Sequence, residues 1–387
     1  MEMMRDIGRH HIFYGAAKRL LLSLAMTSFV LSAVPSAWAA ERTWTTESVG
    51  HGLASSVAID SNQNLHLVYL TGDAKLLYAF RPSSSGKWFS AEILSSTHSA
   101  INVYPRIAVD SYDRPHVCVA TGTLQYITYR GTSWTTQEVD PDSGTLSYHC
   151  SIALGPDGSP HLSWYHEFLP GGKQFTHIRH AQLVDGQWVV HSVDGGISGK
   201  WNSMVVDSKG FPHLSYSQWL TGGDIRYASW DGKTWTIESM PLAGKTAISR
   251  GYDNSLALGA DGTPYISYLD ENALRFAYFK DGKWTVQKVS DISAQYDFYS
   301  GSTIMLLDHQ GTPHILYGDV GAVKHAYWDG KQWQLEVIES GGLGQYANVG
   351  GTIGSDDTLY VSYSDPTDRQ LKVAIGKVSP GSEEIKK

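Results

Sequence analysis

The chain is poor in cysteine, in charge and in long apolar runs, and each shortage excludes a class of protein. Its 387 residues include only two cysteines, Cys118 and Cys150, too few for a disulfide scaffold. These two could pair after export or remain as small core residues. Charged residues make up 18% of the sequence, and 38 acidic residues outnumber 30 basic ones. Since nucleic-acid binding needs a basic surface, no nucleic-acid partner is expected.

The only long apolar run lies near the N-terminus. Basic residues precede a run from Leu20 to Val34, which is followed by the small-x-small sequence Ala37-Trp38-Ala39. Residues 1–39 therefore read as a secretory signal peptide. A membrane anchor is the alternative, but the run is shorter than the roughly 20 residues that a spanning helix needs. We expect a secreted or periplasmic protein with no membrane span after cleavage, carrying 26 basic and 36 acidic residues and a net charge of −10.

Glycine and aromatic residues are abundant, and the chain repeats. It has 39 glycines, 22 tyrosines and 13 tryptophans, a composition typical of turn-rich β-structure. Outside the N-terminal segment no window has the pattern of an amphipathic helix. One unit recurs every 45 to 52 residues, anchored where its first apolar run ends, at Asp60, Asp110, Gly155, Asp207, Gly259, Asp308 and Gly354.

Each copy predicts four short strands, the fourth opening with tryptophan. These tryptophans are Trp44, Trp88, Trp134, Trp188, Trp235, Trp284 and Trp333. The pattern predicts an all-β fold, a seven-bladed β-propeller of four-stranded antiparallel blades spanning residues 40–378, rather than a linear β-solenoid. The last copy ends LKVAIGKV and lacks a fourth strand, whereas Trp44 precedes the first anchor. We therefore expect the N-terminal strand to complete the last blade and close the ring, leaving no exposed edge. Residues 379–387 form a polar tail, and we expect a monomer.

Residues that recur in every copy are expected to be scaffold. The second strand carries His66, His116, His161, His213 and His314, with Tyr265 and Tyr360 at the same position. The third strand carries a basic column of Arg179, Arg226, Arg275, Lys324 and Lys372. Seven equivalent positions cannot all be catalytic, so we interpret the histidine column as packing residues, and most of the basic column likewise.

A polar column that differs in every copy is the candidate for function. It lies where the chain enters each blade, and a symmetric hairpin would set each member opposite a residue of the second strand. The expected pairs are Ala54 with Thr71, Tyr104 with Thr121, His149 with His166, Trp201 with Gln218, Asp253 with Asp270, Ser302 with Asp319, and Asn348 with Asp365. We expect this column on one face of the disc, around the central channel. Variable polar residues on a rigid scaffold are a common route to function.

Blade three is the only blade with two histidines at the open end of its first hairpin, here called the mouth, and we expect His149 and His166 to form a functional pair. Aromatic and cationic residues from this and neighbouring blades would bind an acidic sugar, the rings stacking on it and the cations meeting a carboxylate or sulfate. The expected substrate-binding residues are Tyr104, Arg179, Lys200, Trp201, Gln218, Arg226, Arg250, Asp253 and Asp270. The Asp253–Asp270 pair could also share a proton or hold a cation.

The repeat resembles the bacterial BNR/sialidase-like propellers. The segment Ser229-Trp230-Asp231-Gly232-Lys233-Thr234-Trp235 is similar to the Asp box of that group, lacking one residue between Asp and Gly. The resemblance covers nearly all of the mature chain and implies the fold rather than an activity.

A narrower resemblance is to seven-bladed polysaccharide lyases of the ulvan-lyase type. His149, His166 and Arg179-His180 match that layout in one blade. The resemblance implies a catalytic histidine and tyrosine, with an arginine from a following blade. Trp201 and Gln218 stand at the corresponding mouth positions, so Tyr216 and Tyr252 are the candidate catalytic tyrosines, with Arg226 or Arg250 as the arginine.

Together these patterns predict an exported propeller that binds an acidic polysaccharide and, if it is an enzyme, cleaves it by β-elimination. Three alternatives remain open. The first is a non-catalytic lectin or protein-binding propeller. The second is a glycoside hydrolase using Asp253 and Asp270, since retaining enzymes need carboxyl groups about 5–5.5 Å apart. The third is a metal site at His149, His166 and His177, because imidazoles bind Zn²⁺ or Cu²⁺; otherwise no cofactor is expected.

Overall fold

A computed structural model describes residues 42–95, 97, 103–141, 146–168, 175–195, 199–218, 224–240, 252–270, 273–292, 302–343, 348–365 and 369–378. The expected signal peptide, the C-terminal tail and Arg250 lie outside these residues. Of Tyr252 only the backbone is described. Within this part of the chain no helix is long and apolar enough to cross a membrane.

The described strands form seven four-stranded antiparallel sheets, numbered here as blades in chain order. Blade one holds β2 (Ser55–Ile59), β3 (Leu65–Leu70), β4 (Leu76–Arg81) and β5 (Phe89–Leu94). Blade two holds β6 (Arg106–Val109), β7 (Pro115–Ala120), β8 (Leu124–Tyr129) and β9 (Trp134–Glu138). Blade three holds β10 (Leu146–Leu154), β11 (Pro160–Phe168), β12 (Phe175–Val184) and β13 (Gln187–Asp194). Blade four holds β14 (Lys200–Val206), β15 (Pro212–Ser217), β16 (Ile225–Trp230) and β17 (Trp235–Ser239). Blade five holds β18 (Tyr252–Leu258), β19 (Pro264–Asp270), β20 (Ala273–Lys280) and β21 (Lys283–Asp291). Blade six holds β22 (Thr303–Leu307), β23 (Pro313–Asp319), β24 (Gly321–Trp328) and β25 (Trp333–Leu343). Blade seven holds β26 (Val349–Ile353), β27 (Leu359–Ser364), β28 (Gln370–Val378) and β1 (Arg42–His51).

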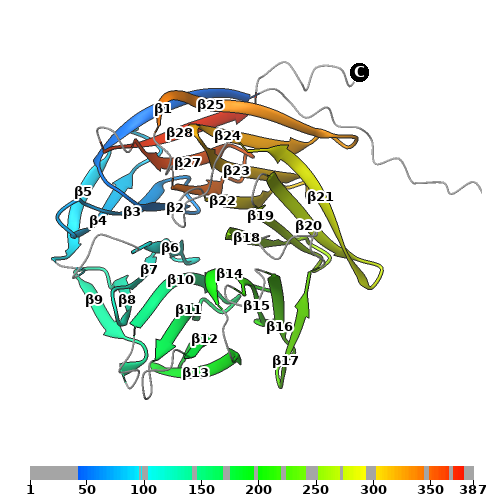
Figure 1. Ribbon diagram of the computed structural model, residues 1–387. Helices are drawn as coiled ribbons and strands as arrows, with labels where there is room; N and C mark the ends of the chain where they lie inside the picture. Colours follow the sequence, from blue (N-terminus) through cyan, green and yellow to red (C-terminus); the bar gives the residue numbers. More distant parts are fainter. Residues whose placement is uncertain are drawn as a thin grey trace, which may run out of the picture. The chain divides into compact units, whose positions relative to one another are not determined.

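The N-terminal strand closes the ring, as the sequence predicts. Strand β1 pairs with β28 from Arg42 opposite Val378 to His51 opposite Gln370, giving the sheet order β1-β28-β27-β26. Figure 1 shows blue β1 lying along red β28 at the rim, with the first strand of each blade innermost. Each first strand contacts the first strand of the next blade, and β26 contacts β2. The predicted seven-bladed propeller is confirmed.

The histidine column is scaffold, as expected. In blade one, buried His66 lies between the Asp60 carboxylate, 3.2 Å away, and the Tyr78 hydroxyl, 2.8 Å away. In this blade the histidine thus links the turn after the first strand to the third strand through two hydrogen bonds. In blade two, His116 makes the same bridge between Asp110 and Tyr126.

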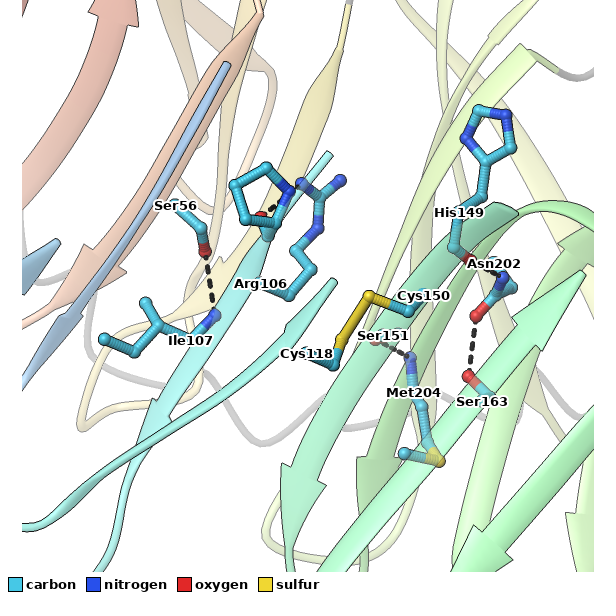
Figure 2. Close-up of a disulfide and its surroundings, with 11 residues drawn as sticks. Ser56, Arg106, Ile107, Cys118, His149, Cys150, Ser151, Ser163, Asn202 and Met204 are labelled. Carbon is cyan, nitrogen blue, oxygen red and sulfur yellow. Dashed lines mark hydrogen bonds between the residues drawn. A yellow bond between two sulfur atoms is a disulfide. The ribbon is translucent and has the colours of Figure 1, made fainter. Parts of the chain in front are cut away.

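A serine ladder links neighbouring blades near the centre. The hydroxyl of Ser56 accepts a bond from the Ile107 N–H at 3.4 Å, and the Ser151 hydroxyl accepts one from the Met204 N–H at 3.1 Å (Figure 2). Ser203 and Ser255 repeat the contact, with the N–H groups of Leu256 and Met305.

The ladder is replaced by a disulfide between blades two and three. The equivalent residue of blade two is Arg106 rather than serine. There Cys118 on β7 is bonded to Cys150 on β10, with Cα atoms 6.4 Å apart. Figure 2 shows the disulfide at this junction, with the Arg106 guanidinium and the His149 ring both pointing to the same side of it. Of the two states that the sequence leaves open for these cysteines, the structure shows the bonded one.

Candidate functional site

The variable column converges on one central cavity of about 30 Å³, here called the axial cavity. All seven column residues line it, one from each blade. The wall also contains Arg106, Asn202 and Asn254. The prediction that the column surrounds the channel on one face is confirmed. The column members are Ala54, Tyr104, His149, Trp201, Asp253, Ser302 and Asn348.

Three successive blades present their column residue in a left-handed backbone conformation. His149 has φ of 50°, Trp201 of 47° and Asp253 of 28°. Left-handed backbone costs a non-glycine residue roughly 1–2 kcal/mol, and outside turns such residues cluster at functional sites. Each residue lies in a β-bulge, an irregularity of register at the start of the first strand. The bulges therefore turn these side chains toward the axis.

Asparagines of the next blade hold the first two bulges. The Asn202 amide donates to the His149 carbonyl and accepts a hydrogen bond from the Ser163 hydroxyl at 2.6 Å. One blade further on, Asn254 makes the same contacts, to the Trp201 carbonyl and from the Ser215 hydroxyl. Both amides are buried.

The expected His149–His166 pair is wrong. Ser147 lies opposite His166 on one side, and His177 lies opposite it on the other. Two features shift the register. The first is the turn, which is centred on Asp157 because the Gly155 N–H bonds the Ser159 carbonyl at 2.8 Å. The second is the bulge in β10, which displaces the pairing with β11 by one more residue. His149 thus points into the axial cavity and His166 does not line it.

His149 is held between aromatic rings and stays neutral. Its ring stacks on Tyr104 at 5.3 Å and lies 5.6 Å from the Trp201 ring. Burial, with the nearby charges of Lys200 and Arg106, lowers the pKa of His149 to about 3. At neutral pH the imidazole is therefore an uncharged donor and acceptor.

Arg106 and Asp253 bring opposite charges into the same cavity. Burial raises the pKa of Asp253 to about 7, although the Arg106 guanidinium opposes the shift. Burial also lowers the pKa of Arg106. Sequence reasoning missed Arg106, although a signal was present: it replaces the serine that Ser56, Ser151, Ser203 and Ser255 repeat in four other blades.

Lys200 borders the site from blade four. Its ammonium lies 5.7 Å from the Tyr165 ring centre and 5.9 Å from that of Trp201. Burial lowers the pKa of Lys200, and the Glu167 carboxylate opposes the shift. The structure thus places Tyr104, Lys200 and Trp201 around His149.

The expected carboxylate pair does not form. Asp253 stands in its bulge, so that Tyr252 and Asn254 take the register positions opposite Leu269 and Tyr268. Asp270 instead accepts a hydrogen bond from the Arg275 Nε at 2.5 Å. The register therefore does not set the two carboxylates opposite each other, as the hydrolase alternative assumed.

Tyr216 and Arg226 belong to the scaffold, which corrects their predicted roles. The Tyr216 side chain is fully buried, and its hydroxyl donates to Asp194 at 2.8 Å. Arg226 donates to the same carboxylate at 2.6 Å. Blade seven repeats the arrangement with Tyr363 and Lys372 on Glu339.

Two further expected residues lie away from the axial cavity. Arg179 pairs with Asp140 across the junction of blades two and three. The backbone N–H of Gln218 bonds the Asp224 carbonyl at 2.9 Å, and neither Arg179 nor Gln218 lines the cavity.

His166 and His177 form a separate pair on blade three. His166 is buried, and burial together with Arg179 lowers its pKa to about 4, with Asp140 opposing and His177 adding to the shift. Because His149 faces the axis, the three histidines of the metal alternative do not come together. Among the described residues no group of three His, Cys, Asp or Glu side chains could hold a metal ion.

Comparison with known proteins supports the fold. No protein-family model matches the chain, and no curated protein matches it by sequence. The crystal structure of polysaccharide lyase Uly1 is similar, with a TM-score of 0.53 and 12% identity, over 90% of this chain and 96% of that chain. The BP39L lectin from Burkholderia pseudomallei has a TM-score of 0.62 and 12% identity, over 85% of this chain and 96% of the lectin. A mutant of Aleuria aurantia lectin in complex with alpha-methyl-L-fucoside has a TM-score of 0.52 and 14% identity, over 76% of this chain and 98% of the lectin. At such identities the likeness shows the fold alone.

Proposed function

We propose that the protein is exported and binds an acidic polysaccharide at the axial cavity. The observation that carries the proposal is the convergence of Arg106, His149 and Asp253 beside the Tyr104 and Trp201 rings. A cavity of about 30 Å³ admits a group the size of one or two waters. A uronate carboxylate fits such a space, whereas a whole sugar ring does not. The sugar ring would then stack on the aromatic side chains outside it.

Charge supports an anionic ligand. Arg106 and Lys200 are both partly buried cations near a neutral imidazole, and a guanidinium can bind a carboxylate through two parallel hydrogen bonds. The Cys118–Cys150 disulfide supports export, because disulfides persist in oxidising compartments.

The decisive experiment is titration with uronate oligosaccharides by isothermal calorimetry. Arg106→Gln should weaken binding at least tenfold, because it removes the partly buried cation that lines the cavity. Arg130→Gln is the matched control, since Arg130 is exposed and does not line the cavity. Equal affinities of the two variants, or equal binding of neutral oligosaccharides by the unaltered protein, would refute the proposal.

β-Elimination is the second candidate activity, favoured by the similarity to polysaccharide lyase Uly1 and by the neutral His149. In that reaction a base takes the proton α to the carboxylate, the bond to the leaving oxygen breaks, and a carbon–carbon double bond forms as that oxygen is protonated. His149 would be the base, while Arg106 would stabilise the charge developing on the carboxylate. A base with pKa near 3 is weak, so we expect slow turnover. The ultraviolet absorbance of the unsaturated product, with His149→Ala as the inactive comparison, tests this activity.

A further inference from the structure

A larger pocket lies between blades three and four, on the face opposite the axial cavity. Its volume is about 450 Å³, within the range of small-molecule sites. The turns that join the first two strands of both blades form part of its wall. The rings of Phe211 and Trp230 line it, together with His180, Gln182, His191 and Lys209. None of these residues belongs to the axial cavity.

Blade six shows how the equivalent position is normally filled. There His325 sits opposite Glu336 in the sheet, and its Nδ1 bonds the Glu336 carboxylate at 2.9 Å. The same Oε2 atom accepts a hydrogen bond from the indole N–H of Trp44, in the next blade, at 3.2 Å. One carboxylate oxygen therefore satisfies a buried imidazole and a half-buried indole.

Blade three has the same imidazole and indole without the carboxylate. His180 corresponds to His325, and His191 stands opposite it where Glu336 would be. The imidazole Nε2 of His180 contacts His161 at 3.1 Å, as His325 contacts His314 at 2.9 Å. Trp235 packs edge-on against His180 at 5.5 Å, as Trp44 packs against His325 at 5.8 Å.

Two buried nitrogen atoms are consequently left without a partner among the described residues, Nδ1 of His180 and Nε1 of Trp235. His180 is only 3% exposed and lines the pocket. Leaving a buried polar atom unsatisfied destabilises the protein, so a ligand oxygen that reaches these atoms would be bound more tightly. In the tautomer that matches blade six, both nitrogens are donors and require an acceptor.

We infer that this pocket is a second binding site, which takes a uronic acid residue with its carboxylate in the place of the Glu336 side chain. The sugar ring would lie against Trp230 and Phe211, and Lys209 adds a cation at the rim. Asp157 is the one acidic residue among the described residues of the wall, and its carboxylate accepts a hydrogen bond from the Ser159 N–H at 2.9 Å. The inference does not depend on the axial cavity, because none of the described residues that line one site lines the other.

The test is calorimetric titration with glucuronate, with glucose as the neutral probe and Arg106→Gln as the background that removes the axial site. The Arg106→Gln variant should still bind glucuronate, and it should bind glucose at least tenfold more weakly than glucuronate. Adding His191→Glu supplies the missing carboxylate from the protein itself, so the fold should be retained and binding lost. Adding His191→Ala leaves the pocket open, so affinity should stay within about threefold.

A matched pair of tryptophans separates ligand binding from packing. Trp230→Ala should weaken glucuronate binding at least tenfold, whereas Trp328→Ala, the equivalent position in blade six, should leave it unchanged. Retention of affinity in the His191→Glu variant, loss of all binding with Arg106→Gln alone, or equal affinity for glucose would overturn the inference. If Arg106→Gln leaves glucuronate binding unchanged while His191→Glu abolishes it, this site stands and the axial site is the one refuted.

Discussion

Single residues decide the chemistry of the axial cavity. Asp253 lines the same cavity as Arg106, and its pKa is raised to about 7. When the Asp253 carboxyl is protonated, it no longer neutralises the Arg106 charge, which is then available to a ligand. His149, with a pKa of about 3, stays neutral over the same range. Binding should therefore respond to pH through Asp253.

Uronate affinity should be highest between about pH 5 and pH 6.5. In this window the uronate carboxyl, with an ordinary pKa near 4, is ionised and Asp253 is protonated. Above pH 7 ionised Asp253 competes for Arg106, and affinity should fall by up to about tenfold per unit. Titrations at several pH values would measure this, and Asp253→Asn should flatten the profile. A wild-type profile that is already flat from pH 5 to pH 9 would exclude this role of Asp253.

The residues also show what sequence can and cannot predict. The column from Ala54 to Asn348 could be placed correctly because its members stand six residues before each repeat anchor. The cross-strand partners could not, since bulges and odd-numbered turns displace a strand by one residue without any marked sequence signal. Arg106 could have been found as the charged residue at a position that is serine in four other blades and Ile304 or Gly350 in the remaining two. The pocket beside His180 could have been found by noting that His191 replaces the acid of blade six.

At the scale of the strand, the bulges are the feature that creates the axial site. The first two strands of blades one, two, six and seven pair without a shift of register, whereas those of blades three, four and five contain one. The strained residues lie in these bulged strands, and the asparagine of the following blade supports two of them. The shape of one blade therefore depends on its neighbour.

Replacing Asn202 with alanine should lower the free energy of unfolding by about 1–3 kcal/mol, because the Ser163 hydroxyl and the His149 carbonyl lose their partner. Chemical denaturation would measure the change. Asn62→Ala is the control, since its amide bonds Asp113 at the exposed surface and should change stability by less than about 0.5 kcal/mol. An Asn202→Ala variant as stable as the control would show that the bulge needs no support.

At the scale of the whole molecule, the ring is closed by pairing between its two ends. Strand β1 covers β28 along its length, and Trp44 also contacts blade six through Glu336. Blade seven is thus the one blade in the described ring that draws strands from both ends of the chain.

Deleting residues 40–50 should unfold the domain or lower its melting temperature sharply, because the deletion exposes the edge of β28. Differential scanning calorimetry would measure the effect. Truncation of the same length at the C-terminus, residues 379–387, should have little effect if that segment is a tail as predicted. A truncated protein without β1 that melts like the intact one would contradict strand closure.

The Cys118–Cys150 disulfide should contribute about 3–4 kcal/mol, as expected for two cysteines 32 residues apart. Cys118→Ser with Cys150→Ser should therefore melt at a lower temperature than the oxidised protein and be insensitive to reductant. If reductant lowers the melting temperature of both proteins equally, the bond contributes nothing at this junction.

The Cys118–Cys150 bond can also form only at a certain stage after synthesis of the chain. Thiols stay reduced inside most cells, so newly made protein would have neither the serine contact nor the covalent link between blades two and three. Until the chain reached an oxidising compartment, this junction would be held by its apolar packing, the Gly122–Ser147 backbone bridge and the Arg179–Asp140 ion pair, without the covalent link. If the protein is exported, as proposed, the blade that carries the Arg106 cation would gain the stability of the disulfide only after export, and a chain retained in the cell would be the more readily unfolded and degraded.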